Sequence, residues 1–440
     1  MQILILNTPI TTNFSVMAGS AGGDDTMSPI LQFLLVLAIM ILAAKGAGYL
    51  STRLGQPAVL GELLAGLVLG PSLLNIYSWG FMSAADSASL SATIKKLSEL
   101  GVIFLMFMAG LELNLKDMFK VGKVAIFSGT SGVIFPVVLG FLVALPFGYV
   151  GDKALFIGIL LAATSVSISA QTLLELGVLR KKEGVALLGA AVLDDILVVL
   201  VFSIYLSLAT GGGGGMLEIL LEIFKMLVFF GITILLGRTV LPWLMARVKK
   251  LPISEGLLAF TIALIALTAW AAEYLGGVAM IVGAFLLGVL IGQTRFKHEL
   301  QEKFHAIMYS LFVPLFFVSV GLIIDLTSIS GDAWLFALVL CGVAIGSKIL
   351  GCGLGARLAG FDNRSSLRLG LGMVSRGEVG LIVASIGISK GIINQNVYAG
   401  AVVMVLATTL FTPLALKWAF KESKKAVESS ATPPATADVN

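Results

Sequence analysis

Long apolar segments separated by short polar loops run along most of the chain. At about 20 residues per bilayer crossing, this pattern predicts thirteen membrane-spanning helices between residues 29 and 420. The expected segments are 29–50, 58–77, 97–115, 122–147, 154–178, 183–209, 216–245, 254–273, 276–293, 304–325, 333–358, 364–389 and 394–420. A chain with this pattern is an all-α polytopic membrane protein whose outer helices contact the lipid bilayer.

The two ends of the chain lack this pattern. Residues 1–28 have neither the basic start nor the cleavage site of a signal peptide, so we expect an extracytoplasmic N-terminal segment. Residues 421–440 are polar and contain proline. Such a composition cannot bury enough apolar surface to fold, and we expect a disordered cytoplasmic tail.

The composition supports a membrane protein and excludes several function classes. Of 440 residues, 58% are hydrophobic and 12% are charged, whereas soluble proteins carry about 25% charged residues. The chain has no phosphate-binding loop, no Ser-His-Asp set and no histidine or cysteine metal cluster. The sequence therefore predicts no enzyme, no cofactor and no nucleic-acid partner. Cys341 and Cys352 would lie about 16 Å apart on one helix, too far to bridge each other.

Lysine and arginine gather in the loops that follow odd-numbered segments. These loops include Arg180, Lys181 and Lys182; Arg247, Lys249 and Lys250; and Arg357, Arg364 and Arg368. The opposite loops are poor in basic residues, and "GGGGG" (211–215) has none. Because short cytoplasmic loops are enriched in lysine and arginine, we expect an outside N-terminus and a cytoplasmic C-terminus.

Two pairs of glycine-rich motifs indicate an internal repeat. "GELLAGLVLG" (61–70) and "GAFLLGVLIG" (283–292) begin 222 positions apart, and "MAGLELNL" (108–115) and "SVGLIIDL" (319–326) begin 211 positions apart. Each offset spans seven predicted helices, and an odd number reverses the direction of crossing. The two halves are therefore inverted relative to each other, as in many secondary transporters.

The repeat pairs the two most polar stretches within predicted helices. At an offset of 211, "TSVSIS" (164–169) aligns with "SRGEVG" (375–380). Hydroxyl groups and glycine at mid-membrane suit broken helices whose free backbone groups line a cavity. We expect the two breaks to cross, with Arg376 and Glu378 neutralising the partial charges of the half-helix ends.

Asp194 and Asp195 stand side by side near the middle of segment 183–209. An ionisable group at the bilayer centre costs about 2.5–3.5 kcal/mol and marks a functional site. Neighbours on a helix point about 100° apart, so one carboxylate can pair while the other faces water. Lys348, near the middle of segment 333–358, is the candidate partner for either aspartate, and Glu378 is its alternative partner.

These residues resemble the bacterial monovalent cation:proton antiporters, most closely the NapA-type sodium/proton antiporters. The specific match is the pair in "AAVLDDILVVL" (190–200) combined with Lys348 and "SRGEVGLIVASIG" (375–387). Further matches are "LGQPAVLGELLAGLVLGPSLL" (54–74), "GVIFLMFMAGLEL" (101–113), "AATSVSISAQTLLELGVL" (162–179) and "LFFVSVGLIIDL" (315–326). The resemblance implies a NapA/NhaA-like fold in the bacterial inner membrane.

The resemblance also assigns roles to residues. Asp195 would bind the cation or the proton, with Asp194 beside it and paired with Lys348 in the empty state. Thr164 and Ser165 would help coordinate Na⁺ at the two aspartates. The family works as a homodimer, in which a core around 154–209 and 333–389 moves against a dimer scaffold that includes 29–77 and 216–293.

The function implied is electrogenic exchange of Na⁺ or Li⁺ for H⁺ by alternating access. A K⁺/H⁺ antiporter of the Kef type is the alternative, although that type carries Gln-Asp where this chain has Asp194 and Asp195. A cation channel would not need inverted halves around a midplane site. A sodium-coupled symporter for an organic anion would have two carboxylates repelling its substrate.

Overall fold

The computed structural model describes residues 27–79, 84–209, 216–325 and 331–430, and every regular element within these ranges is helical. The first half contains α1 (Pro29–Arg53), α2 (Ala58–Leu69), η2 (Ile76–Ser78), α3 (Ala84–Glu112), α4 (Leu115–Ala144), η3 (Leu145–Phe147), α5 (Asp152–Ala162), α6 (Val166–Glu175) and α7 (Lys182–Ala209). The second half contains α8 (Met216–Thr239), α9 (Leu241–Val248), α10 (Gly256–Tyr274), α11 (Met280–Ile291), α12 (Lys297–Ile307), the π-helical η4 (Met308–Phe312), α13 (Val313–Leu322), α14 (Gly331–Leu358), α15 (Asn363–Gly372), α16 (Glu378–Ser389) and α17 (Gln395–Ser430).

Nine helical stretches within the described ranges are long and apolar enough to cross a membrane. The all-helical membrane fold predicted from the sequence is therefore confirmed. The interrupted stretch 152–175 counts as one of the nine, and three shorter apolar helices accompany them. The structure does not describe residues 1–26, the "GGGGG" loop or residues 431–440, so the predictions for them lie outside the described residues. We expected a disordered tail from residue 421, but α17 continues as helix to Ser430.

Two predicted spans are too long. α2 and α11 have 12 residues each, or about 18 Å of helix, against about 30 Å for a bilayer core. α2 stops at Leu69 because Gly70 precedes a proline, a position that disfavours helical backbone. α11 starts late because Gly277 has a φ of +64°, which belongs to a turn. The predictions of full crossings over 58–77 and 276–293 are wrong for this reason.

The repeat motifs form two matching helix crossings. α2 crosses α13 at Gly66, where an added Cβ would lie 2.1 Å from the carbonyl oxygen of Val318. α11 crosses α3 at Gly288, where an added Cβ would lie 2.1 Å from the carbonyl oxygen of Phe107. Each crossing joins one helix from each half of the chain, as an inverted repeat requires. Only glycine lets two backbones approach this closely.

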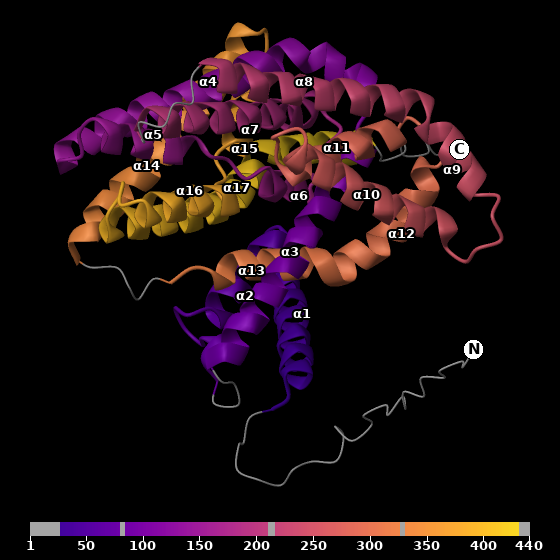
Figure 1. Cartoon of the computed structure of the whole chain (residues 1–440), viewed down its shortest axis with the longest axis horizontal. Coiled ribbons are helices and arrows are strands. Elements are labelled where there is room, and N and C mark those ends of the chain that lie inside the picture. The colour runs from indigo at the N-terminus through magenta and orange to yellow at the C-terminus, as the bar shows by residue number, and fades with distance from the viewer. Residues whose placement is uncertain (1–26, 80–83, 210–215, 326–330, 431–440) are drawn as a thin grey trace, which may run out of the picture.

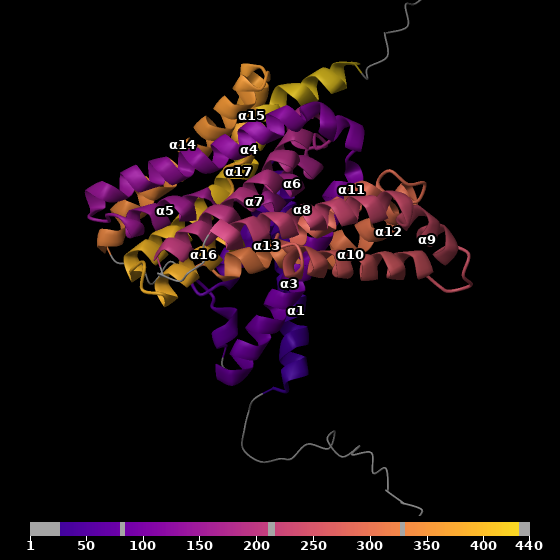
Figure 2. The same cartoon turned by 45° about the horizontal axis from the view of Figure 1, so that its top comes forward.

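The helices pack into two groups. We call α4–α7 and α14–α17 the core group, because α4 packs on α5, α7 and α14, and α14 on α15 and α17. We call α1–α3 and α8–α13, with η4, the scaffold group, in which α3 packs on α11 and α13. Figures 1 and 2 show α5, α14 and α16 on one side, α9, α10 and α12 on the other, and α6 between them.

Candidate ion-binding site

The two interrupted helices cross at a pair of serines. Residues 163–165 separate α5 from α6, and residues 373–377 separate α15 from α16. The backbone N–H of Ser165 donates to the carbonyl of Ser375 at 2.9 Å, and the Ser375 hydroxyl donates to the carbonyl of Ser165 at 2.6 Å. Backbone groups freed by each break are thus satisfied by the other break. The crossing predicted from the repeat is present.

The first break is shorter than expected. Helix resumes at Val166, so most of "TSVSIS" (164–169) is helical rather than broken. Hydroxyl groups in α6 bond within or between helices, as Thr172 Oγ1 does to the carbonyl of Ile168 at 2.8 Å. A helix accommodates such bonds without ending, so the predicted break is present but confined to residues 163–165.

Arg376 neutralises the end of a half-helix. Its guanidinium donates to the carbonyls of Val374 at 2.6 Å and Met373 at 3.3 Å, immediately after α15 ends. It also donates to the carbonyl of Ala344 on α14 at 3.3 Å, and the side chain is fully buried. A cation here offsets the negative end of the α15 dipole. Glu378 begins α16, but its side chain lies outside the described part of the structure.

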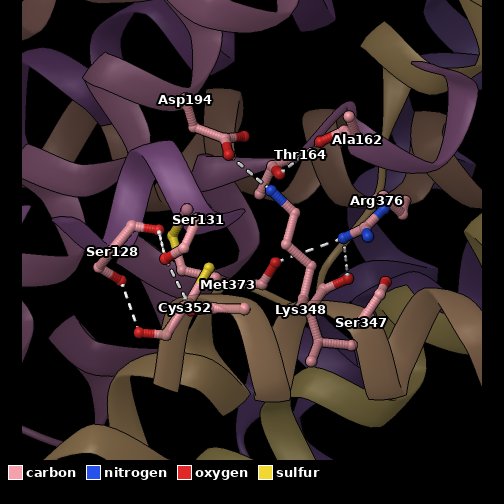
Figure 3. Close-up of polar contacts among 12 residues, drawn as sticks. Ser128, Ser131, Ala162, Thr164, Asp194, Ser347, Lys348, Cys352, Met373 and Arg376 are labelled. Atoms are coloured by element: carbon pink, nitrogen blue, oxygen red, sulfur yellow. Dashed lines mark hydrogen bonds and ion pairs between the residues drawn. The ribbon is translucent and has the colours of Figure 1, made fainter. Parts of the chain in front are cut away.

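Asp194 forms a buried ion pair with Lys348. The lysine Nζ on α14 lies 2.6 Å from Asp194 Oδ1 on α7, and both side chains are 0% exposed. Figure 3 shows the ammonium pointing at the carboxylate, with Thr164 close by. Gly132 on α4 leaves room for the pair, since an added Cβ would lie 3.4 Å from Asp194 Oδ1 and 2.5 Å from Cys352 Sγ.

Asp195 has a different environment from its neighbour. Asp194 is fully buried, whereas Asp195 on the same helix is partly exposed. Thr164 and Ser165 in the first break are almost fully buried, and Thr164 Oγ1 donates to the carbonyl of Ala162 at 3.1 Å. The two neighbouring aspartates therefore differ: Asp194 is fully buried and paired with Lys348, whereas Asp195 is partly exposed.

Two threonines that the sequence analysis did not single out hydrogen-bond to the backbone of the second break. Thr409 Oγ1 on α17 donates to the carbonyl of Arg376 at 2.6 Å, and Thr408 Oγ1 accepts from the Arg376 N–H at 3.3 Å. The break therefore has partners for both backbone groups of Arg376. Two adjacent threonines in an apolar helix could have indicated a polar partner. Their partner Arg376 could not be identified from the sequence, because it lies 32 or 33 positions away.

The loop before α15 fixes the start of that half-helix. Asp362 accepts from the backbone N–H of Ser365 at 3.2 Å and pairs with Lys182 at 3.0 Å, which joins α15 to α7. The hydrogen bonds from Ser365, followed by the contact with Lys182, hold the pKa of the Asp362 carboxyl well below its usual range.

The cysteines take no part in covalent cross-linking. Cys341 and Cys352 are both buried free thiols, as their predicted separation on one helix requires. No group of three or more histidine, cysteine, aspartate or glutamate side chains in the described ranges is placed to hold a metal ion.

Crossed, interrupted helices from two inverted halves, with a buried ion pair beside the crossing, are typical of secondary transporters. The comparisons with known proteins specify which kind. Residues 34–422 match the transmembrane sodium/hydrogen exchanger family. The chain belongs to this family.

Curated relatives extend along nearly the whole chain. The Na(+)/H(+)-K(+) antiporter GerN of Bacillus cereus is 41% identical over 91% of this chain and 99% of its own length. The Na(+)/H(+) antiporter of Enterococcus hirae is 38% identical over 89% of this chain and 99% of its own length. The antiporter resemblance drawn from the aspartate pair, Lys348 and the second break is confirmed.

A solved structure shows the same fold. The sodium proton antiporter MjNhaP1 of Methanocaldococcus jannaschii superposes with a TM-score of 0.66 over 90% of this chain and 98% of its own. The two sequences are 17% identical, so this likeness concerns the fold alone. It supports the NapA/NhaA-like architecture of inverted halves and broken helices.

Proposed function

We propose that this chain exchanges Na⁺ or Li⁺ for H⁺ across the bacterial inner membrane by alternating access. The observation that carries the proposal is the split environment of the aspartates: Asp194 is bound to Lys348 at 2.6 Å, while its neighbour Asp195 is partly exposed. Family membership and the names of the relatives support the same reaction.

Competition for one carboxylate explains how exchange is coupled. Asp195 neutralised by a proton has no charge left for a cation, and Asp195 neutralised by Na⁺ binds a proton poorly. Na⁺ prefers oxygen ligands, and the hydroxyls and carbonyls of Thr164 and Ser165 in the first break supply such ligands together with the aspartates. Competition for this one site couples the two ions, so the protein needs no separate gate that recognises Na⁺ and H⁺ together.

Lys348 adds a second group that responds to the ion. A cation arriving at the aspartates draws Asp194 away from the ammonium, and a buried lysine without its counter-charge tends to lose its proton. If two protons leave for each cation bound, transport moves net charge, and membrane voltage drives it.

The names of the relatives keep potassium as a second candidate substrate. GerN is named for Na⁺, H⁺ and K⁺, and a relative from Saccharomyces cerevisiae, 26% identical, is named a K(+)/H(+) antiporter. The adjacent aspartates favour the sodium-type reaction, because the Kef type has glutamine in the first position.

We also propose how the molecule works in the membrane. The core group would move against the scaffold group, and the scaffold group would join two copies as a homodimer. The basic loops support a cytoplasmic C-terminus and an outside N-terminus. These assignments extend the packing of the two groups into an alternating-access cycle.

Proton flux in proteoliposomes tests the reaction. Vesicles with an imposed pH gradient and an internal pH-sensitive dye receive Na⁺, Li⁺ or K⁺ in turn. Dissipation of the gradient by Na⁺ or Li⁺ is expected, and a response to K⁺ alone would replace the proposed substrate. Repeating the assay with the membrane potential clamped at several values tests voltage dependence; identical rates at every potential would refute electrogenic exchange.

A further inference from the structure

The first turn of α2 is capped by a residue from a distant helix. Pro57 precedes α2 and provides no side-chain cap. Glu175, the last residue of α6, supplies one instead: the backbone N–H of Ala58 donates to Glu175 Oε2 at 2.7 Å, and that of Val59 donates to Oε1 at 3.3 Å. A carboxylate at a helix N-terminus accepts charge-assisted hydrogen bonds and complements the helix dipole.

This cap joins the core group to the scaffold group. α6 belongs to the core group and α2 to the scaffold group. A second contact follows five residues later, where Arg180 pairs with Glu112 at the end of α3. Both contacts involve the segment 175–180, next to the basic loop that the sequence places in the cytoplasm. Relative movement of the two groups by more than a hydrogen-bond length breaks them.

A second buried carboxylate lies one turn along α2 from the cap. Glu62 is 4% exposed, and its Oε2 has no hydrogen-bond partner among the described residues. Its Oε1 lies 3.6 Å from the ammonium of Lys45, a side chain on α1 that is 47% exposed. Glu62 and Glu175 interact electrostatically, so the charge on one affects the other.

The other groups facing this cluster supply little positive charge. Gln171 on α6 donates to Glu175 Oε1 at 3.0 Å, and its own carbonyl oxygen is buried without a partner in the described structure. Tyr309 in η4 also lies close enough to interact electrostatically with Glu175 and Glu62, as well as with Glu112 on α3. Two carboxylates that share one half-exposed ammonium cannot both be ionised at low cost. A proton on one of the two carboxylates would relieve this repulsion.

We propose that Glu175 is a positioning residue for ion exchange, that its bonds to α2 latch the core group onto the scaffold group, and that a proton shared with Glu62 sets how firmly this latch holds. With the proton on Glu62, Glu175 keeps its charge and caps α2. Loss of that proton places a second negative charge beside Glu175 and weakens the latch. This inference rests on the proposed alternating-access function, because the latch matters only if the two groups move.

Chemical labelling tests the latch without measuring transport. Val59 is fully buried beside the cap, and both natural cysteines are buried, so Val59→Cys reports opening of this interface to a polar maleimide. In purified protein in nanodiscs, adding Glu175→Gln should raise the labelling rate about tenfold, since a neutral acceptor forms a weaker bond. Glu175→Gln keeps an acceptor oxygen, so it tests the latch even if Glu175→Ala does not fold.

Asp362→Asn is the matched control. Asp362 also caps a helix on this face, but its partners Ser365 and Lys182 belong to the core group. It should leave labelling of Val59→Cys unchanged. An unchanged rate in folded Glu175→Gln, or an equal increase in Asp362→Asn, would overturn the latch.

The pH profile of labelling tests the shared proton. In Val59→Cys alone, labelling corrected for maleimide reactivity should increase with pH. Adding Glu62→Gln should hold the rate at its low-pH value throughout, and retention of the full pH dependence would remove Glu62 from the proposal. Because labelling requires no transport, loss of the latch and loss of the exchange reaction would appear in different experiments.

Discussion

Lys348 Nζ lies 2.6 Å from Asp194 Oδ1, and this contact joins α14 to α7 in the middle of the core group. Both side chains are fully buried, so each depends on the other for a counter-charge. The pair connects the half of the chain that carries the aspartates with the half that carries the lysine.

Removal of the lysine should destabilise the protein. Lys348→Ala leaves Asp194 as a buried carboxylate without its partner, and breaking a buried pair in this way costs about 3–5 kcal/mol. We expect a lower Tm in thermal unfolding of the detergent-solubilised protein. The double variant Asp194→Asn with Lys348→Gln should recover part of the loss, because neither group then carries an unpaired charge. Equal melting of Lys348→Ala and wild type would show that the pair does not stabilise the fold.

Gly132 provides space beside the ion pair. An added Cβ at this position would lie 2.5 Å from Cys352 Sγ, and overpacking in a buried site costs about 1–3 kcal/mol. Gly132→Ala should therefore lower the Tm. Adding Cys352→Ala removes the contacting sulfur and should restore most of the stability, as a double-mutant cycle would measure. Purely additive effects of the two substitutions would contradict this packing.

The crossing of α11 and α3 should tolerate no side chain at Gly288. Its Cβ would lie 2.1 Å from a backbone carbonyl, which cannot move away as a side chain can. Gly288→Ala should sharply reduce the monodisperse fraction in size-exclusion chromatography. Gly342 on α14 is the control, because an added Cβ there meets nothing within 4 Å and alanine favours helix by about 0.5–1 kcal/mol. Similar losses in both variants would contradict the crossing.

Asp362 predicts a specific loss of stability in acid. Its pKa is depressed in the folded protein, so its stabilising effect is present above the unfolded pKa of about 4 and disappears as the pH falls through the lower folded value. The Tm of wild type should therefore fall more steeply below about pH 4 than that of Asp362→Asn. Parallel curves for the two proteins would show that Asp362 makes no pH-dependent contribution.

Much of the fold follows from the apolar pattern and the repeat. Apolar length predicted most helices, and the offset of 211 placed the two polar stretches at one crossing. Helix ends were less predictable where apolar residues continue past a break. The sequence after Leu69 remains apolar, but Gly70 and Pro71 end α2 there. A count of apolar residues cannot predict this change from helical to extended backbone at Gly70.

The charged residues of the candidate site could be predicted, because a charge inside the membrane is costly. Contacts between residues that are far apart in the sequence could not be predicted. Asp194, Lys348 and Arg376 stand out because buried charges need compensation. The cap that Glu175 places on α2 could not be inferred, because 117 positions separate it from Ala58 and a glutamate at a helix end is ordinary. Such contacts depend on how the two helix groups pack, which local sequence does not encode.

The central claim is that Asp195 binds the exchanged ions. The most direct test measures cation-dependent proton flux in the Asp195→Asn variant. The substitution keeps the size of the side chain and removes its titrating charge. In proteoliposomes with an imposed pH gradient, Na⁺ should dissipate the gradient with wild-type protein and have no effect with Asp195→Asn, while both proteins remain folded by size-exclusion chromatography. Sodium-dependent proton movement at the wild-type rate in Asp195→Asn would contradict the account.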